Sequence, residues 1–238
     1  MTSTPVGMRC PECARQSTKV RTMRAITDDP TLTYILIGIN VVVGLAAIFG
    51  GDIGRGGGTL EDSWELSRQQ LADGDLWRLV TSGFIHRGPF HLAANMLALW
   101  ILGTMLEPVL GRWRFALIYF VALLCGSLGV LLFSAEESAG ASGAVFGLMG
   151  AAIIVARNRG IGLWESGLGL WLGLNLLITF TIPNISIGGH IGGLAGGFVA
   201  AFVLEELEGR RGVPRYLPEA AVAALGVAAV AISIAQYG

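Results

Sequence analysis

Four strongly polar side chains lie within or at the edge of long apolar stretches of this sequence, where such groups are costly and therefore candidates for function. They are His91, Asn95, Ser142 and His190. A serine hydroxyl becomes a nucleophile when a base takes its proton, and histidine is the usual base near neutral pH. The tetrahedral intermediate of acyl transfer needs hydrogen-bond donors, which asparagine and histidine side chains can supply. Together the four residues could fill every role in acyl transfer.

Each of these residues also has a simpler interpretation. His91 and Asn95 stand four positions apart on one helical face, and could form hydrogen bonds that only pack helices. Ser142 opens an apolar segment, where serine most often serves as a helix N-cap. His190 could be a buried histidine bonded to a carbonyl. Its apolar segment has no Asp or Glu at similar depth, so a catalytic site would use a Ser–His dyad rather than a triad.

The spacing of glycines predicts that the serine and the second histidine meet. Two tracks of glycines follow them: Gly143, Gly147 and Gly150 after Ser142, and Gly193 and Gly197 after His190, which Gly189 precedes. Small residues at four-residue spacing let helix backbones approach closely in a membrane. If the two tracks pack together, they bring the hydroxyl and the imidazole to one end of the helices.

The elements that position these residues are membrane-spanning helices. Of the 238 residues, 53% are hydrophobic and 14% are charged, whereas soluble chains average about 25% charged. A bilayer core about 30 Å thick needs roughly 20 apolar residues. Seven segments approach this length, at about 32–49, 90–110, 113–133, 142–156, 162–182, 186–204 and 220–235. The sequence therefore predicts an all-α polytopic membrane protein.

Charge predicts the orientation of these spans. Most of the 16 basic residues lie in the first thirty residues and in alternate connections, which places the N-terminus in the cytoplasm and the C-terminus outside. We expect a plasma-membrane location, with the first apolar helix as an uncleaved anchor, because no signal-peptide pattern precedes it. The net charge of −1 does not provide the basic footprint of a nucleic-acid-binding protein, so no nucleic-acid partner is expected.

A stretch at about 50–89 lies outside on this topology and mixes charges with Trp64, Trp77 and Phe84. Amphipathic segments of this kind lie in the plane of the interface. The alternative is a disordered loop, although disordered segments are poor in aromatic residues.

The N-terminal region contains one Cys-x-x-Cys pair, Cys10 and Cys13. Such a pair is half of a structural zinc site, and no second pair stands in the polar segments. We therefore expect no bound metal and no cofactor.

The pattern as a whole resembles the rhomboid family of intramembrane serine proteases, in particular its bacterial members with six helices plus one. The matching motifs occur in family order over about residues 30–206: Trp77-Arg78, His86, His91-x-x-x-Asn95, Glu107, Gly111, Gly140-x-Ser142-Gly143 and His190-x-x-Gly193-x-x-x-Gly197. The resemblance implies a rhomboid-like six-helix bundle plus one C-terminal transmembrane helix. The domains would be a tail at 1–30, a catalytic core at 31–206, and a linker with the seventh helix at 207–238.

The resemblance also implies residue roles. Ser142 would be the nucleophile and His190 the base, with His91, Asn95 and the Ser142 backbone N–H as oxyanion donors. Trp77 and Arg78 would belong to a membrane-embedded first loop, and Glu107 to the polar network that braces it. Phe146 departs from the family, because some members place there a tyrosine that stacks on the base.

These expectations favour an endopeptidase that cleaves transmembrane segments of membrane proteins near the external face. The alternatives are a catalytically inactive rhomboid-like binding factor and a small-solute transporter. An inactive homologue would be expected to lack the serine or the histidine, and transporters place their sites near the midplane. In this sequence both residues are present, and the polar cluster lies toward one face of the membrane.

Overall fold

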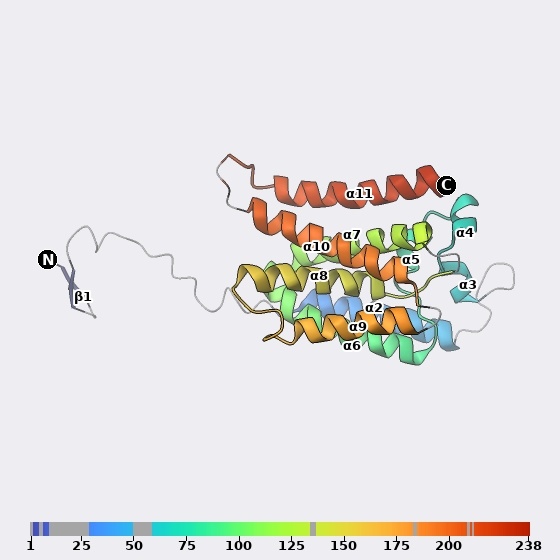
Figure 1. Cartoon of the computed structure of the whole chain (residues 1–238), viewed down its shortest axis with the longest axis horizontal. Coiled ribbons are helices and arrows are strands. Elements are labelled where there is room, and N and C mark those ends of the chain that lie inside the picture. Colours follow the sequence, from blue (N-terminus) through green and yellow to red (C-terminus); the bar gives the residue numbers. More distant parts are fainter. Residues whose placement is uncertain are drawn as a thin grey trace.

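A computed structural model describes residues 2–4, 7–9, 29–49, 59–133, 137–182, 185–208, 210 and 212–238. A helix corresponds to each predicted span: α2 (Thr31–Phe49), α6 (Pro89–Leu110), α7 (Arg112–Phe133), α8 (Ser142–Asn158), α9 (Leu168–Thr181), α10 (Ile187–Leu207) and α11 (Leu217–Tyr237). These helices form a bundle (Figure 1). All but α8 and α9 are long and apolar enough to cross a membrane. The prediction of an all-α polytopic membrane protein is confirmed for this bundle.

Among the described residues, a small antiparallel hairpin near the N-terminus adds two strands to the helical fold. It pairs β1 (Thr2–Thr4) with β2 (Gly7–Arg9), so that Thr2 lies opposite Arg9. No alternation of apolar and polar residues in the sequence predicted these short strands.

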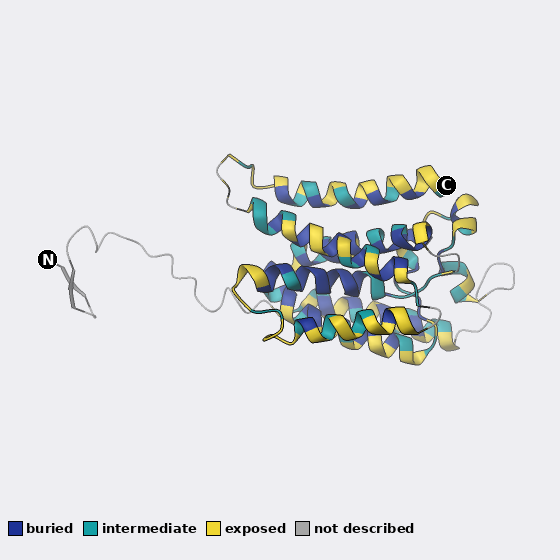
Figure 2. Cartoon of the chain, viewed as in Figure 1, coloured by how far each residue is buried: buried dark blue, intermediate teal, exposed yellow. Residues whose placement is uncertain are grey.

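Helix α8 is the interior helix of the bundle. Its residues are buried along almost its whole length, and it packs against α7 and α10 on two sides and against α6 on a third (Figure 2). Because protein rather than lipid surrounds α8, its 17 residues do not need the full thickness of the bilayer. The outer helices instead expose large apolar side chains such as Val42, Leu97 and Val227, as helices in contact with lipid do.

Helix α9 is shorter than its predicted span of 162–182, because it begins only at Leu168. The preceding Gly167 has a left-handed conformation with φ 77°, which ends the turns that follow α8. Only Gly169 and Thr179 are buried on this helix. Helix α9 therefore lies on the outside of the bundle, with most of its surface uncovered.

The predicted external stretch folds into three short helices at one end of the bundle: α3 (Leu60–Trp64), α4 (Arg68–Ala72) and α5 (Arg78–Thr81). Side chains cap two of them, Thr59 in a capping box with Asp62 and Ser67 through the N–H of Gln70. Leu66, Leu71 and Leu79 are buried against α7. The disordered alternative is therefore wrong for residues 59–89, while residues 50–58 lie outside the described part.

The C-terminal helix α11 packs along α7 and ends beside α4 (Figure 1). There the Arg68 guanidinium lies over the Tyr237 ring, 5.4 Å from its centroid. The same guanidinium donates hydrogen bonds to the Leu131 and Leu132 carbonyls at 2.6 and 3.1 Å. The seventh helix thus contacts both a core helix and the short helices of the external stretch.

Candidate active site

Ser142 is the first residue of α8, and its hydroxyl does not cap the helix. The N-cap is Ala141, and no side chain there bonds to the backbone of α8. Among the described residues the Ser142 hydroxyl has no hydrogen-bond partner, so the N-cap interpretation is wrong. The side chain is half-buried and lines a cavity of about 30 Å³, which has room for about one water molecule.

The segment leading to Ser142 is fixed from three sides. The Gly140 N–H donates to the Ser82 carbonyl at 2.8 Å, and the Ala141 N–H points to Nε2 of His86 at 3.4 Å. A two-bond bridge joins Leu66 and Ser138, with N···O distances of 3.0 and 2.9 Å. The external stretch therefore helps to position the serine.

His190 lies on α10 and faces α8. Its side chain is buried and stacks on Phe146, with ring centroids 4.1 Å apart and planes 19° from parallel. Phe146 follows Ser142 by one helical turn, so both share the face of α8 that meets His190. No hydrogen bond joins Ser142 to His190 in the described chain, and catalytic hydrogen bonds commonly tighten only when substrate binds.

The two glycine tracks pack against each other as predicted. A Cβ on Gly193 would lie 2.9 Å from the Gly143 Cα and closer still to other Gly143 atoms. A Cβ on Gly197 would clash in the same way with the Gly147 backbone. Because only glycine fits at such contacts, the spacing of the glycines brings the beginning of α8 to the beginning of α10.

Thr179 is a site residue that the sequence analysis missed. Its Oγ1 lies 2.7 Å from His190 Nδ1, and it is buried although most of α9 is exposed. The dyad was predicted from the absence of Asp or Glu near His190, an argument that does not cover a threonine partner. A short connection separates Thr179 from the beginning of α10, so the sequence places both residues at the same end of the bundle, but it does not indicate that they face each other.

His91 and Asn95 lie on α6 at the same end. The His91 ring borders Gly140, where a Cβ would lie 2.6 Å from Cε1 of the imidazole. This contact places His91 beside the chain two residues before Ser142. Asn95 is buried, and its Nδ2 donates to the His91 carbonyl at 3.0 Å, a bond within α6 that joins no second helix. An amide carries two protons, so one donor remains.

His86 lies before α6 and contacts the ring of His91 edge to face, with centroids 5.1 Å apart. Burial, followed by the neighbouring His91, lowers the pKa of His86 to about 4. The imidazole is therefore neutral near pH 7 and can accept the Ala141 N–H described above.

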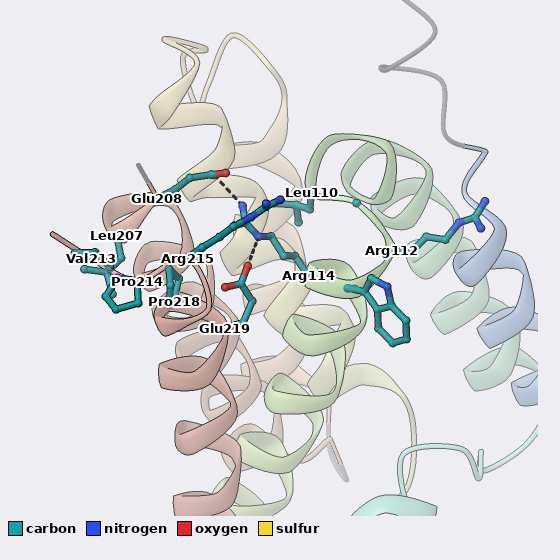
Figure 3. A pocket seen from close by; sticks show the side chains of 12 residues that line it. Leu110, Arg112, Arg114, Leu207, Glu208, Val213, Pro214, Arg215, Pro218 and Glu219 are labelled. Atoms are coloured by element: carbon teal, nitrogen blue, oxygen red, sulfur yellow. Dashed lines mark hydrogen bonds and ion pairs between the residues drawn. The ribbon is translucent and has the colours of Figure 1, made fainter. Parts of the chain in front are cut away.

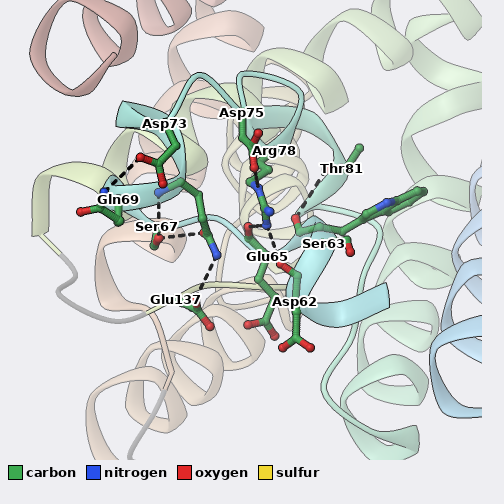
Figure 4. A network of polar contacts seen from close by, with 12 residues as sticks. Asp62, Ser63, Glu65, Ser67, Gln69, Asp73, Asp75, Arg78, Thr81 and Glu137 are labelled. Carbon is green, nitrogen blue, oxygen red and sulfur yellow. Dashed lines mark hydrogen bonds and ion pairs between the residues drawn. The ribbon is translucent and has the colours of Figure 1, made fainter. Parts of the chain in front are cut away.

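The short helices are held by a buried arginine (Figure 4). The Arg78 Nε donates to Asp75 at 2.8 Å, and Nη1 donates to the carbonyls of Asp62 and Glu65 at 2.7 and 2.9 Å. Trp77, its neighbour in the predicted motif, is instead 53% exposed. Of this pair, Arg78 braces the loop from inside, and Trp77 faces outward.

A second arginine links the same loop to the segment before Ser142. Arg87 makes two hydrogen bonds of 2.7 Å to the Glu65 carboxylate and one of 3.2 Å to the Glu137 carbonyl. These bonds with Glu65 raise the pKa of Arg87. No motif in the sequence indicated this pair.

Glu107 differs from its expected role. Its buried carboxylate accepts hydrogen bonds from the N–H groups of Leu32 and Thr33 at 2.9 and 2.7 Å, and from the Thr33 hydroxyl at 2.7 Å. It therefore caps the beginning of α2 and does not brace the short helices. The reason is its place on α6, more than four turns beyond His91, at the opposite end of the bundle. Gly111, with φ 79°, ends α6 there.

The predicted metal half-site cannot be placed, because Cys10 and Cys13 lie outside the described residues. Within the described ranges, no group of three or more His, Cys, Asp or Glu residues could hold a metal ion.

Comparison with known proteins shows which family has this arrangement of residues. The rhomboid domain family matches residues 73–206, which include every residue of the site described above from Trp77 to Gly197. The chain belongs to the rhomboid family. It is 42% identical over 179 residues, or 74% of its length, to the rhomboid protease GluP of Bacillus subtilis. It is also 34% identical over 146 residues, or 59% of its length, to the putative rhomboid protease YdcA of the same organism.

The chain matches different fractions of the lengths of these two rhomboid relatives. The matched region is 35% of GluP and 73% of YdcA, so the chain spans about a third of the length of the longer relative. One relative, 35% identical over 57% of this chain and matched over 38% of its own length, is the inactive RHOMBOID-like protein 8 of Arabidopsis thaliana. The family therefore includes both proteases and a protein named as inactive.

Proposed function

We propose that this rhomboid is an intramembrane serine endopeptidase that uses Ser142 as nucleophile and His190 as base. The observation that carries the proposal is the Ser142 hydroxyl at the beginning of α8, which has no hydrogen-bond partner among the described residues and lies one turn from the stack of Phe146 on His190. The names of GluP and YdcA as rhomboid proteases support the same reaction class.

The reaction proceeds in two steps. Ser142 Oγ attacks the scissile carbonyl carbon while Nε2 of His190 takes its proton, which forms a tetrahedral oxyanion. His91, Asn95 and the Ser142 N–H donate hydrogen bonds to that oxygen. The C–N bond then breaks, the amine leaves with the proton from His190, and an acyl ester remains on Ser142. Water, deprotonated by His190, hydrolyses the ester and restores the hydroxyl.

The substrates are transmembrane segments of other membrane proteins. A helix hides its carbonyls in internal hydrogen bonds, so the scissile bond must first unwind. Segments with Gly or Pro near the cleavage site are therefore preferred. A small residue such as Ala precedes the cut, because Gly140 borders His91 and Gly143 borders α10, which leaves little room for a larger side chain.

The site lies at the external face of the plasma membrane. The described basic residues near the ends of α6, α8 and α10 are at the opposite end of the bundle from Ser142, which supports a cytoplasmic location for that end. The N-terminus is then cytoplasmic, the C-terminus is external, and cleavage occurs in the outer part of the membrane.

Cleavage of a transmembrane reporter in liposomes tests this proposal. We expect product from the wild type and none above background from Ser142→Ala or His190→Ala, with both variants retaining the wild-type unfolding midpoint. Ser233→Ala is the matched control, because that buried serine lies on α11 and donates only to the Ala229 carbonyl. Absence of cleavage by the wild type would favour the inactive binding factor, and cleavage by Ser142→Ala would refute the dyad.

A further inference from the structure

The hydrogen bonds of Thr179 determine which nitrogen of His190 carries a proton. The Thr179 Oγ1 lies 2.7 Å from the Asn175 carbonyl oxygen and 2.7 Å from His190 Nδ1. A hydroxyl has a single proton to donate. A carbonyl can only accept, so the proton of Thr179 goes to Asn175. The contact with the histidine is then a hydrogen bond only if Nδ1 carries a proton and donates it to Thr179.

We infer that Thr179 is the positioning residue of the base, fixing His190 as the tautomer with its proton on Nδ1 and its lone pair on Nε2. This inference rests on the proposed function, in which Nε2 takes the proton of Ser142. In the opposite tautomer the Thr179 hydroxyl would have to donate its proton to Nδ1. The Thr179 and Asn175 oxygens would then be in contact at 2.7 Å without a proton between them. It would also leave no lone pair on the nitrogen that must act as base.

Two contacts together fix the ring completely. Stacking on Phe146 sets the plane of the imidazole, with 19° between the rings, but allows the ring to turn over within that plane. The bond to Thr179 removes this freedom, because turning the ring over would replace Nδ1 by a carbon. Thr179 thus supplies the orienting function that a carboxylate supplies in a triad, without placing a charge in the buried site.

The exposure of α9 supports a dedicated role for this threonine. Thr179 is 2% exposed, while neighbouring Phe180 and Leu177 are 60% and 59% exposed. Thr181 bonds to the carbonyl four residues earlier at 2.7 Å, just as Thr179 does, but it is exposed and has no contact with His190. The chain therefore contains a matched control for the loss of a threonine hydroxyl from α9.

Three variants test the inference: Thr179→Val, Thr179→Ser and Thr181→Val. The readouts are kcat and KM on a transmembrane reporter, the rate at which a fluorophosphonate labels Ser142, and the unfolding midpoint. We expect Thr179→Val to lower kcat and the labelling rate by about 10 to 100-fold, the usual effect of losing an orienting partner, with KM unchanged. Thr179→Ser should retain most of the rate, and Thr181→Val should match the wild type.

A direct measurement of the tautomer separates positioning from stability. In protein labelled with ¹⁵N-histidine, the His190 signals of the wild type should report a protonated Nδ1, and those of Thr179→Val a mixture of tautomers. Equal rates in Thr179→Val and wild type, or a serine variant as slow as the valine variant, would overturn the inference. Failure of the proposed function looks different, because the wild type itself would then neither cleave nor become labelled.

A second, independent feature lies at the opposite end of the bundle. A cavity of about 790 Å³ opens where the beginnings of α7 and α11 meet the end of α10, and it is lined by Arg112, Trp113, Arg114, Glu208, Arg215 and Glu219 among others (Figure 3). Arg114 donates to Glu208 through Nη1 and to Glu219 through Nε, both at 2.8 Å. Its Nη2 makes no hydrogen bond to the described residues. Arg215 makes no hydrogen bond or ion pair to them either, although its charge acts on nearby Glu219.

The cavity also contains an unused acceptor. The Glu219 Oε2 is buried without a hydrogen-bond partner among the described residues. A ligand that fits would therefore carry an anion for Arg215 and the Nη2 of Arg114, and a hydroxyl for the Glu219 oxygen. Within the described part of the chain, three arginines and two glutamates line the cavity, which favours a ligand with a single negative charge. The N-terminal tail is a poor occupant because it has more basic than acidic residues.

We further infer that this cavity binds the head group of phosphatidylglycerol, whose phosphodiester and glycerol hydroxyls provide these two features. The position of the cavity supports a membrane lipid as the ligand, because the cavity lies at the ends of membrane-crossing helices. Trp113 beside it is 88% exposed, as interfacial tryptophans are.

Native mass spectrometry of the full chain in detergent, titrated with phosphatidylglycerol or phosphatidylcholine, tests this second inference. We expect tighter binding of phosphatidylglycerol, and an affinity about fivefold weaker in Arg215→Gln, since one interfacial arginine contributes about that factor. Arg159→Gln is the control, because Arg159 is exposed at the same end beyond α8. Equal binding of both lipids, equal loss in both variants, or equally strong binding of soluble glycerol phosphate would overturn it.

Discussion

Gly193 lies so close to Gly143 that the two helix backbones touch where the site is formed. A Cβ on Gly193 would be 2.6 Å from the Gly143 carbonyl carbon and 2.9 Å from its Cα. Gly143 directly follows the candidate nucleophile, and Gly193 follows the candidate base by one turn. The separation of Ser142 and His190 is therefore set by backbone contact, and any side chain at Gly193 must change it.

Replacing Gly193 by alanine should reduce both activity and stability. The added methyl group has only backbone atoms to displace, and such overpacking costs about 1 to 3 kcal/mol. We expect cleavage of the reporter to fall to background because the helices must separate at Ser142. Gly173→Ala is the control, since a Cβ there meets nothing within 4 Å on the exposed helix α9. Wild-type cleavage by Gly193→Ala would show that the glycine contact does not set the geometry of the site.

His86 should make the protein less stable in acid. Its pKa is about 4 in the folded state against an ordinary value of 6.5, so between these values the unfolded chain binds more protons. The contribution of neutral His86 to the free energy of unfolding is therefore fully present above pH 6.5. It is lost as the pH drops toward 4, which lowers the free energy of unfolding by about 2 to 3 kcal/mol if His86 alone titrates. Unfolding midpoints measured in one detergent between pH 4 and 7 should show this decline, and His86→Gln should flatten it. An unchanged pH dependence in His86→Gln would contradict a neutral, buried His86.

Asn95→Ala should slow cleavage without preventing it. Loss of one oxyanion donor costs about 10²- to 10³-fold in kcat, because the Ser142 N–H and His91 still donate. KM should be unchanged, since the donor acts in the transition state. Steady-state kinetics on the reporter would measure both constants. A rise in KM at constant kcat would instead assign Asn95 to substrate binding, and full activity would leave it only its hydrogen bond to the His91 carbonyl within α6.

Periodic features of the fold could be predicted from the sequence, because they depend on composition and spacing. The seven spans and the contact between the glycine tracks are of this kind. The predictions that failed depend on where a helix ends or on which residue lies opposite another. Glu107 was assigned to the short helices, although its distance along α6 from His91 places it at the other end. The predicted span at 162–182 is longer than helix α9, because an apolar run does not reveal the turn at Gly167.

Features that depend on three-dimensional pairing could not be read from the sequence. Thr179 is one of several threonines in the chain, and its burial depends on how α9 lies against α10. Arg87 and Glu65 are 22 residues apart in a stretch that matched no motif beyond Trp77-Arg78 and His86. Both pairs join segments whose relative placement only the fold defines.

The central claim is that His190 activates Ser142, and the covalent labelling of the chain by a fluorophosphonate tests it most directly. The intact mass of the purified protein should increase by one adduct, and fragmentation should place that adduct on Ser142. His190→Ala should remain unlabelled over the time in which the wild type reacts completely, and Ser142→Ala should never react. An adduct on another residue, or labelling of His190→Ala at the wild-type rate, would contradict the account.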